Sequence, residues 1–94
     1  MSAEAVRAKN LRTRYGMTVE EYDRLLDSQG GVCAICSTGT PGGRGRFHVD
    51  HCHTSGMIRG LLCNDCNVGI GRLADDPIRC MQAAKYLING GYDS

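Results

Sequence analysis

Large aromatic side chains are scarce in this chain of 94 residues, which has no tryptophan and only one phenylalanine, Phe47. A chain of this length is expected to form one domain with a small core, and the shortage of aromatic anchors leaves that core smaller still. Domains of this kind commonly need a bound metal or disulfides for stability. The composition therefore predicts a source of stability other than hydrophobic burial.

The sequence also lacks a recognisable signal peptide and any apolar run long enough to cross a membrane. We therefore expect a cytoplasmic protein with no membrane partner. Disulfides are rare in a reducing cytoplasm, so paired cysteines there are more often metal ligands.

Four of the six cysteines form two Cys-X-X-Cys pairs, Cys33/Cys36 and Cys63/Cys66. Together these pairs offer four soft ligands, the set that closes a tetrahedral site around one structural zinc ion. A disulfide or redox pair is the alternative, but two pairs at this spacing favour the metal. Of the remaining cysteines, Cys80 lies in a helical pattern and is interpreted as a small buried side chain, whereas Cys52 could compete for the metal.

All three histidines of the chain lie between the two cysteine pairs, in the run His48-Val-Asp50-His51-Cys-His53. Hydrolysis of a phosphodiester needs a water nucleophile, a base that deprotonates it and a cation that stabilises charge on the phosphate. Histidine titrates near neutrality and suits the base. Carboxylate and amide oxygens suit Mg²⁺, and Asp50 and Asn67 are the candidates for those two ligands.

The adjacency of Asp50 and His51 places a condition on the backbone. Residues 47–50 and 58–62 are expected to form short strands, and adjacent residues of a regular strand point to opposite sides. The first strand must therefore end or bend at this point if both side chains are to act in one site.

The net charge of +1 hides a separation of charge along the chain. Acidic residues gather in the segments 20–27 and 75–76, whereas basic residues dominate elsewhere. The basic residues concerned are Arg7, Lys9, Arg12 and Arg14 near the start, followed by Arg44, Arg46, Arg59 and Arg72. A basic face of this kind favours a partner with a phosphate backbone, although solvated helix faces are the alternative interpretation.

Two helices are predicted on the N-terminal side of the strands. The first spans residues 3–15, and the second begins at the capping box Thr18-Val-Glu-Glu21 and stops at Gly30-Gly31. The apolar face of the second helix consists of Val19, Tyr22, Leu25 and Leu26. Residues 37–46 are rich in glycine and threonine and are expected to form a loop.

Two more helices are predicted after the strands, the first at residues 64–73. The sequence Asp75-Asp76-Pro77 opens the last helix, which ends at Gly90-Gly91. Its apolar face consists of Met81, Ala84, Leu87 and Ile88. Without internal repeats or a linker, the chain is predicted to be a single domain, residues 1–94, with a helical part at 1–30, a core at 31–73 and a C-terminal helix from 74 to 94.

Three segments together resemble the HNH, or ββα-metal, nucleases, and most closely the recombination endonuclease VII family. They are Gly-Gly-Val-Cys33-Ala-Ile-Cys36, the histidine run 48–53, and Ile58-Arg59-Gly60-Leu-Leu-Cys63-Asn-Asp-Cys66-Asn67. The resemblance extends upstream through Arg14-Tyr-Gly-Met-Thr-Val-Glu-Glu-Tyr22, and downstream through Gly71-Arg72-Leu-Ala-Asp-Asp-Pro77 to Ala84-Lys-Tyr-Leu87. It implies a small α+β fold: a zinc-stabilised, treble-clef-like ββα-metal HNH core with flanking N- and C-terminal helices.

The resemblance also implies a role for each site residue. Cys33, Cys36, Cys63 and Cys66 would hold a structural zinc ion. His51 would be the general base, Asp50 and Asn67 would bind a catalytic Mg²⁺ or Mn²⁺, and His53 or His48 would assist. Arg59 would clamp a phosphate, and the DNA-binding arginines would be Arg59, Arg44, Arg46, Arg72 and Arg14. The implied reaction is hydrolysis of double-stranded DNA to a 5′-phosphate and a 3′-hydroxyl, by nicking or double-strand cleavage, in a bacterial or phage-infected cell.

Two departures from the family pattern bear on this expectation. The junction-resolving member that gives the family its name has an acidic residue three positions after the asparagine, where this chain has Ile70, which cannot bind a metal or a proton. That archetype also has a long helical dimerisation region after its nuclease core, whereas this chain ends at Ser94. We therefore expect nicking or general cleavage rather than four-way junction resolution, and the oligomeric state is open.

Two other classes of function are open as well. A non-catalytic zinc module that binds DNA or RNA would keep the scaffold and lose the chemistry, and Ile70 favours it. Intact Asp50, His51 and Asn67 favour an enzyme, since a pure binding module has no need of them. A protein-interaction zinc domain would use the acidic helix at residues 19–28 as its surface.

Overall fold

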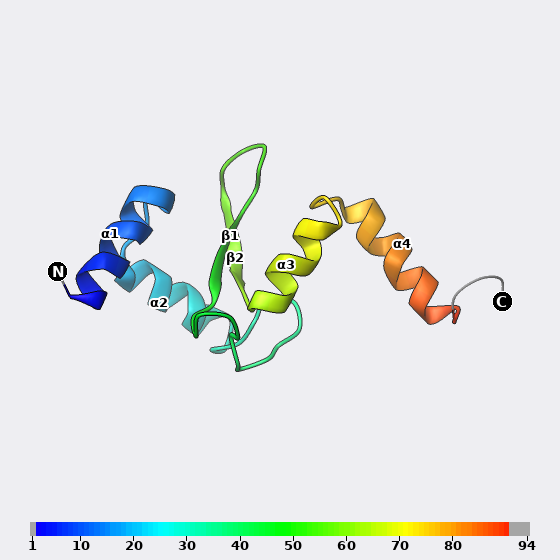
Figure 1. Ribbon diagram of the computed structural model, residues 1–94, viewed down its shortest axis with the longest axis horizontal. Coiled ribbons are helices and arrows are strands. Elements are labelled where there is room, and N and C mark those ends of the chain that lie inside the picture. Colours follow the sequence, from blue (N-terminus) through cyan, green and yellow to red (C-terminus); the bar gives the residue numbers. More distant parts are fainter. Residues whose placement is uncertain (1, 91–94) are drawn as a thin grey trace.

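The computed structural model describes residues 2–90. Its elements in chain order are α1 (Ala3–Tyr15), α2 (Val19–Ser28), β1 (His48–His51), β2 (Ile58–Leu62), α3 (Asn64–Arg72) and α4 (Pro77–Ile88). The β1–β2 hairpin lies between the α1–α2 pair and α3, and α4 follows at the far end (Figure 1). The predicted small α+β class is confirmed. None of the helices in residues 2–90 has the length and apolar character needed to span a bilayer.

Local capping explains where the helices begin. Thr18 and Glu21 form the predicted capping box before α2: the Glu21 N–H donates to Thr18 Oγ1 at 3.0 Å, and the Thr18 N–H donates to Glu21 Oε1 at 3.3 Å. Before α4, the carboxylate of Asp76 accepts a hydrogen bond from the N–H of Ile78 at 2.8 Å, and Pro77 occupies the first turn. Both predicted helix starts are confirmed.

The hairpin is antiparallel and irregular at one point. Asp50 pairs with Gly60, but His51 pairs with Ile58, so Arg59 has no partner on β1. This β-bulge bends the ladder between Asp50 and His51, which is the bend that the sequence required there. The first strand begins one residue later than predicted, because the carbonyl of Phe47 accepts a hydrogen bond from the Tyr22 hydroxyl at 2.6 Å instead of joining the ladder.

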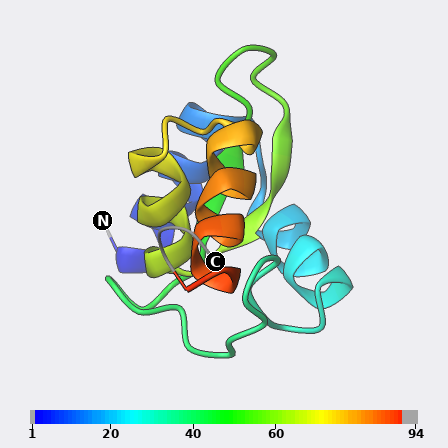
Figure 2. The same cartoon turned by 90° about the vertical axis from the view of Figure 1, so that its right-hand side faces the viewer.

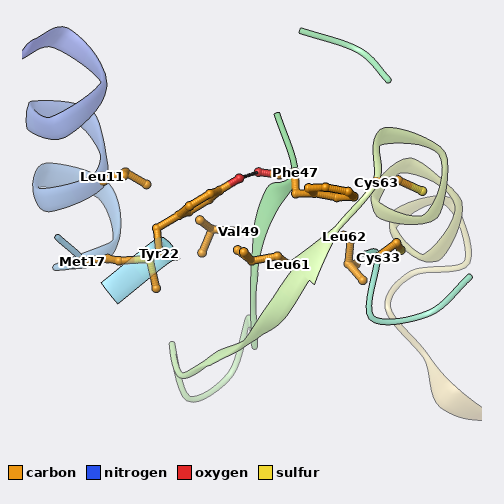
Figure 3. Close-up of a cluster of buried hydrophobic side chains, with 9 residues drawn as sticks. All are labelled: Leu11, Met17, Tyr22, Cys33, Phe47, Val49, Leu61, Leu62 and Cys63. Atoms are coloured by element: carbon orange, nitrogen blue, oxygen red, sulfur yellow. Dashed lines mark hydrogen bonds between the residues drawn. The ribbon is translucent and has the colours of Figure 1, made fainter. Parts of the chain in front are cut away.

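The core is small and includes the metal-site cysteines. Its nine buried side chains are Leu11, Met17, Tyr22, Cys33, Phe47, Val49, Leu61, Leu62 and Cys63, drawn in Figure 3. They come from α1, α2, the hairpin and both cysteine pairs, and Leu61 and Cys33 are the most deeply buried. Since two of the nine are cysteines of the pairs, the core and the predicted zinc site are continuous.

The side chain of Gln29, directly after α2, completes the free edge of β2. Its Oε1 accepts the N–H of Leu61 at 2.8 Å, and its Nε2 donates to the carbonyls of Leu61 at 3.0 Å and Val32 at 2.9 Å. A Cβ at Gly60 would lie 3.1 Å from Gln29 Oε1, so this close approach favours glycine there. Gln29 therefore fixes β2 beside the bulge.

The last helix forms as predicted, but its apolar face is exposed. The side chains of Leu87 and Ile88 are 74% and 82% exposed, Met81 and Ala84 are also exposed, and Cys80 is half-buried. Figure 2, seen from this end of the molecule, shows α4 nearest the viewer, away from α1. Sequence periodicity predicts which residues of α4 share one face, whereas the turn after α3 determines whether that face packs against the rest of the protein. Gly91 of the predicted Gly90-Gly91 stop lies outside the described residues.

Candidate zinc site and active site

The four paired cysteines meet in one cluster, as their spacing predicted. Their sulfur atoms all lie within 4.8 Å of one another, and the Sγ atoms of Cys36 and Cys63 are 3.7 Å apart. Tetrahedral zinc with Zn–S bonds of about 2.3 Å places its sulfur ligands about 3.8 Å apart, so the cluster fits a zinc ion. Cys52 and Cys80 are not members of the cluster.

Backbone N–H groups prepare this cluster for a metal. The N–H of Ile35 donates to Cys33 Sγ and the N–H of Cys66 donates to Cys63 Sγ, both at 3.4 Å. Burial alone would raise the pKa of Cys33, but nearby backbone N–H groups, including that of Ile35, outweigh it and lower this pKa to about 6. Burial and the neighbouring cysteine side chains raise the pKa of Cys66. Cys63 is also the N-cap residue of α3.

Asp50, the predicted carboxylate ligand, lies on β1 and is held by Arg59. The Arg59 Nε is 2.7 Å from Asp50 Oδ2, and its Nη2 is 3.0 Å from Asp50 Oδ1. The same Nη2 is 2.7 Å from Oδ1 of Asp75, in the turn between α3 and α4. The Arg59 hydrogen bond lowers the pKa of Asp75, and the two carboxylates raise the pKa of Arg59. Arg59 therefore joins two acids, where the sequence analysis predicted a phosphate clamp.

His51, the predicted base, lies between two other rings. Its ring centroid is 5.9 Å from that of Tyr15, the last residue of α1, and 5.2 Å from that of His53. His53 also lines a hollow of about 460 Å³ together with Arg59 and Asp75. The hairpin and the turn after α3 therefore bring histidines, carboxylates and an arginine to one place.

The position of the amide candidate follows from the second cysteine pair. Asn67 is half-buried on α3, directly after Cys66, and its N–H donates to the Cys63 carbonyl at 3.0 Å. Within residues 2–90, no hydrogen bond joins its side chain to Asp50. Ile70, which stands where the family archetype has an acid, packs against the hydrophobic core.

The predicted DNA-binding arginines separate into three places. Arg14, Arg44 and Arg46 line a second hollow, of about 760 Å³, between α1 and the segment before β1. Arg59 lines the first hollow, beside His53 and Asp75, and Arg72 is exposed at the end of α3.

Arg7 and His48 also line the second hollow. In the described part of the chain, the hollow's four arginines (Arg7, Arg14, Arg44 and Arg46) form no ion pair. The Nε2 atom of His48 is buried there without a hydrogen-bond partner among residues 2–90.

Sequence reasoning missed the roles of four residues: Asp75, Tyr15, Arg7 and Gln29. For Asp75 there was a usable signal, because one aspartate is enough to cap α4 and the sequence has two before Pro77. For Arg7 the signal was its position seven residues before Arg14, which places both side chains on one face of the predicted helix. For Tyr15 and Gln29 nothing local to the sequence indicated the contact.

Comparisons with known proteins identify the family of this chain. A protein-family model described as recombination endonuclease VII matches residues 8–89. The Gene 59 protein of Mycobacterium phage D29 is 47% identical over 70 residues, which are 74% of this chain and 42% of that protein. The Gene 59 protein of Mycobacterium phage L5 is 42% identical over 76 residues, 80% of this chain and 46% of that protein. The chain thus spans less than half the length of these relatives, and no solved structure matches it significantly.

Proposed function

Because the chain belongs to the recombination endonuclease VII family, we propose that it is a metal-dependent DNA endonuclease of the HNH type. It hydrolyses phosphodiesters of double-stranded DNA to a 5′-phosphate and a 3′-hydroxyl. The observation that carries this proposal is the placement of Asp50, His51 and His53 at the bulged end of the hairpin, where His53 lines a hollow together with Arg59, the partner of Asp50.

Asp50 and Asn67 are the proposed ligands of a catalytic Mg²⁺ or Mn²⁺. Both offer hard oxygen donors and both are half-buried: Asp50 on β1, which pairs with β2, and Asn67 on α3, which follows β2 through the second cysteine pair. When bound, such a cation would polarise the scissile phosphate and stabilise charge on the departing oxygen. A zinc ion held by Cys33, Cys36, Cys63 and Cys66 would have all four positions filled by protein ligands and would stabilise the fold.

His51 is the proposed general base, and a ring nitrogen accepts a proton from the attacking water. The neighbouring rings of Tyr15 and His53, with centroids 5.9 and 5.2 Å away, would help to position the His51 ring. His53 is the assisting histidine, because it lines the same hollow as Arg59 and Asp75. His48 faces the second hollow and belongs to the DNA-binding surface instead.

The hollow lined by Arg7, Arg14, Arg44 and Arg46 is the proposed docking surface for the DNA backbone. Guanidinium groups without carboxylate partners can bind phosphate oxygens and release counterions from DNA; that of Arg7 also lies over the Tyr22 ring, 4.8 Å from its centroid. This grouping favours a nucleic acid over the acidic helix α2 as the basis of partner binding.

The test is nicking of supercoiled plasmid by the zinc-loaded protein, with Mg²⁺ and with EDTA. We expect Mg²⁺-dependent nicking that is lost in His51→Ala and Asp50→Asn, while zinc content and DNA binding are retained. Asp27→Asn, which changes an exposed carboxylate on α2, is the matched control and should nick normally. Normal nicking by His51→Ala would refute its role as the base.

A non-catalytic DNA- or RNA-binding module is the second candidate. Two observations favour it: both oxygens of Asp50 are occupied by Arg59, and Ile70 packs against the hydrophobic core. Retained DNA binding with no nicking in Mg²⁺ or Mn²⁺, from protein shown to hold zinc, would establish this alternative.

A further inference from the structure

Arg59 occupies the carboxylate that is proposed to bind the catalytic cation. Both oxygens of Asp50 accept hydrogen bonds from it, at 2.7 and 3.0 Å, in a bidentate pair. A divalent cation needs at least one of these oxygens at about 2.0–2.2 Å, in a position that the positive guanidinium opposes. Cation binding therefore requires Arg59 to release at least one oxygen of Asp50.

Asp75 provides a second carboxylate acceptor for Arg59. Its Oδ1 lies 2.7 Å from the same Nη2 that contacts Asp50, so the guanidinium is already shared between the two acids. Arg59 is also the extra residue of the bulge, without a partner on β1. If the Arg59 guanidinium releases Asp50, it can keep its charged hydrogen bond to Asp75.

The turn that carries Asp75 is unusual. Ala74 and Asp75 both have left-handed backbone angles, with φ of 60° and 56°, which non-glycine residues rarely adopt in succession. The Asp75 N–H donates to the Ile70 carbonyl at 2.8 Å and holds this conformation. The helix cap of α4 is supplied by Asp76, so capping does not explain Asp75. The Ala74 N–H also donates to the Gly71 carbonyl at 3.1 Å, so the two bonds form a Schellman motif that ends α3, and this turn fixes Asp75 beside Arg59.

We propose that Asp75 is a positioning residue that holds Arg59 away from Asp50 when a divalent cation binds there. Arg59 then stays at the edge of the hollow, where a phosphate group of DNA would lie. This inference rests on the proposed function, since it assumes that Asp50 is a cation ligand. Asp75 acts through Arg59 and does not itself bind the cation.

The test measures Mn²⁺ binding directly, from the loss of the free-ion signal in electron paramagnetic resonance, on zinc-loaded protein without DNA. Asp75→Asn keeps the shape and removes the charge, so we expect binding weaker by about tenfold, as when a residue supporting a metal ligand is changed. Asp76→Asn, the neighbouring acid, is the matched control and should bind Mn²⁺ like the wild type. Asp50→Asn should abolish binding at this site.

Removing Arg59 separates positioning from direct ligation. Arg59→Gln should bind Mn²⁺ at least as tightly as the wild type, and adding Asp75→Asn to it should have little further effect. An equal loss on Asp75→Asn with and without Arg59 would overturn the proposal and make Asp75 a ligand. Wild-type affinity in Asp75→Asn would also overturn it. Absence of Asp50-dependent Mn²⁺ binding in the wild type would instead overturn the proposed cation site itself.

Discussion

Replacing Gln29 with alanine is predicted to destabilise the zinc-loaded protein by about 2 kcal/mol. The side-chain amide of Gln29 makes three hydrogen bonds to backbone groups, and two of them satisfy the free edge of β2 at Leu61. Leu61 is the most deeply buried residue of the core, so water does not replace these bonds easily.

The magnitude follows from counting the groups left without a partner. The carbonyl of Leu61 keeps a second donor, the N–H of Ala34 at 3.1 Å, and the half-buried Val32 can reach water. The N–H of Leu61 loses its only acceptor in the described chain, and a buried donor without a partner costs about 1–3 kcal/mol. For a domain of this size, a loss of about 2 kcal/mol lowers the melting temperature by roughly 10 °C.

Urea unfolding of zinc-loaded protein, followed by circular dichroism, measures the difference. The matched control is Gln82→Ala, which truncates the chain's other glutamine, exposed on α4, and should change stability by less than about 0.5 kcal/mol. Equal stability of the two variants would refute the reasoning, because it would mean that the Gln29 bridge to β2 contributes nothing net.

Three further predictions concern the zinc site and the DNA-binding surface. Cys33→Ser should lose zinc and cooperative thermal unfolding, whereas Cys80→Ser should keep both, as measured by zinc content and calorimetry. Cys33 has a pKa of about 6, so zinc binding must displace one more proton below that pH than above it. The logarithm of the zinc affinity, measured by chelator competition, should therefore fall by about one additional unit per pH unit below about pH 6. An unchanged slope would contradict this pKa. Arg14→Ala should reduce the salt dependence of DNA binding by about one phosphate contact in fluorescence anisotropy, whereas Arg79→Ala, on α4, should not; equal slopes would place DNA elsewhere.

The features that sequence predicted well are those determined within a few residues. The capping box at Thr18 and Glu21 and the cap before Pro77 depend on side chains that reach their own backbone, so spacing alone identifies them. The meeting of the four cysteines follows from ligand chemistry, because two Cys-X-X-Cys pairs have few other uses in such a chain.

The features that sequence could not give depend on how elements meet. The need for a bend between Asp50 and His51 was predictable, but its form, an extra residue at Arg59 on the other strand, depends on the pairing of two strands. The exposure of Ile88 and its neighbours depends on the left-handed turn at Ala74 and Asp75, and no periodicity reports such a turn.

The cysteine cluster and the proposed cation site are tied by chain geometry. Cys63 directly follows Leu62, the last residue of β2, and Asn67 directly follows Cys66, so the second pair is the joint between the hairpin and α3. Asp50 is fixed to β2 by its pairing with Gly60. A zinc ion at this joint would therefore set how far the carboxylate on one element lies from the amide on the other. In a domain with so small a core, we expect loss of this restraint to weaken the proposed cation site, even though the zinc itself would take no part in the chemistry.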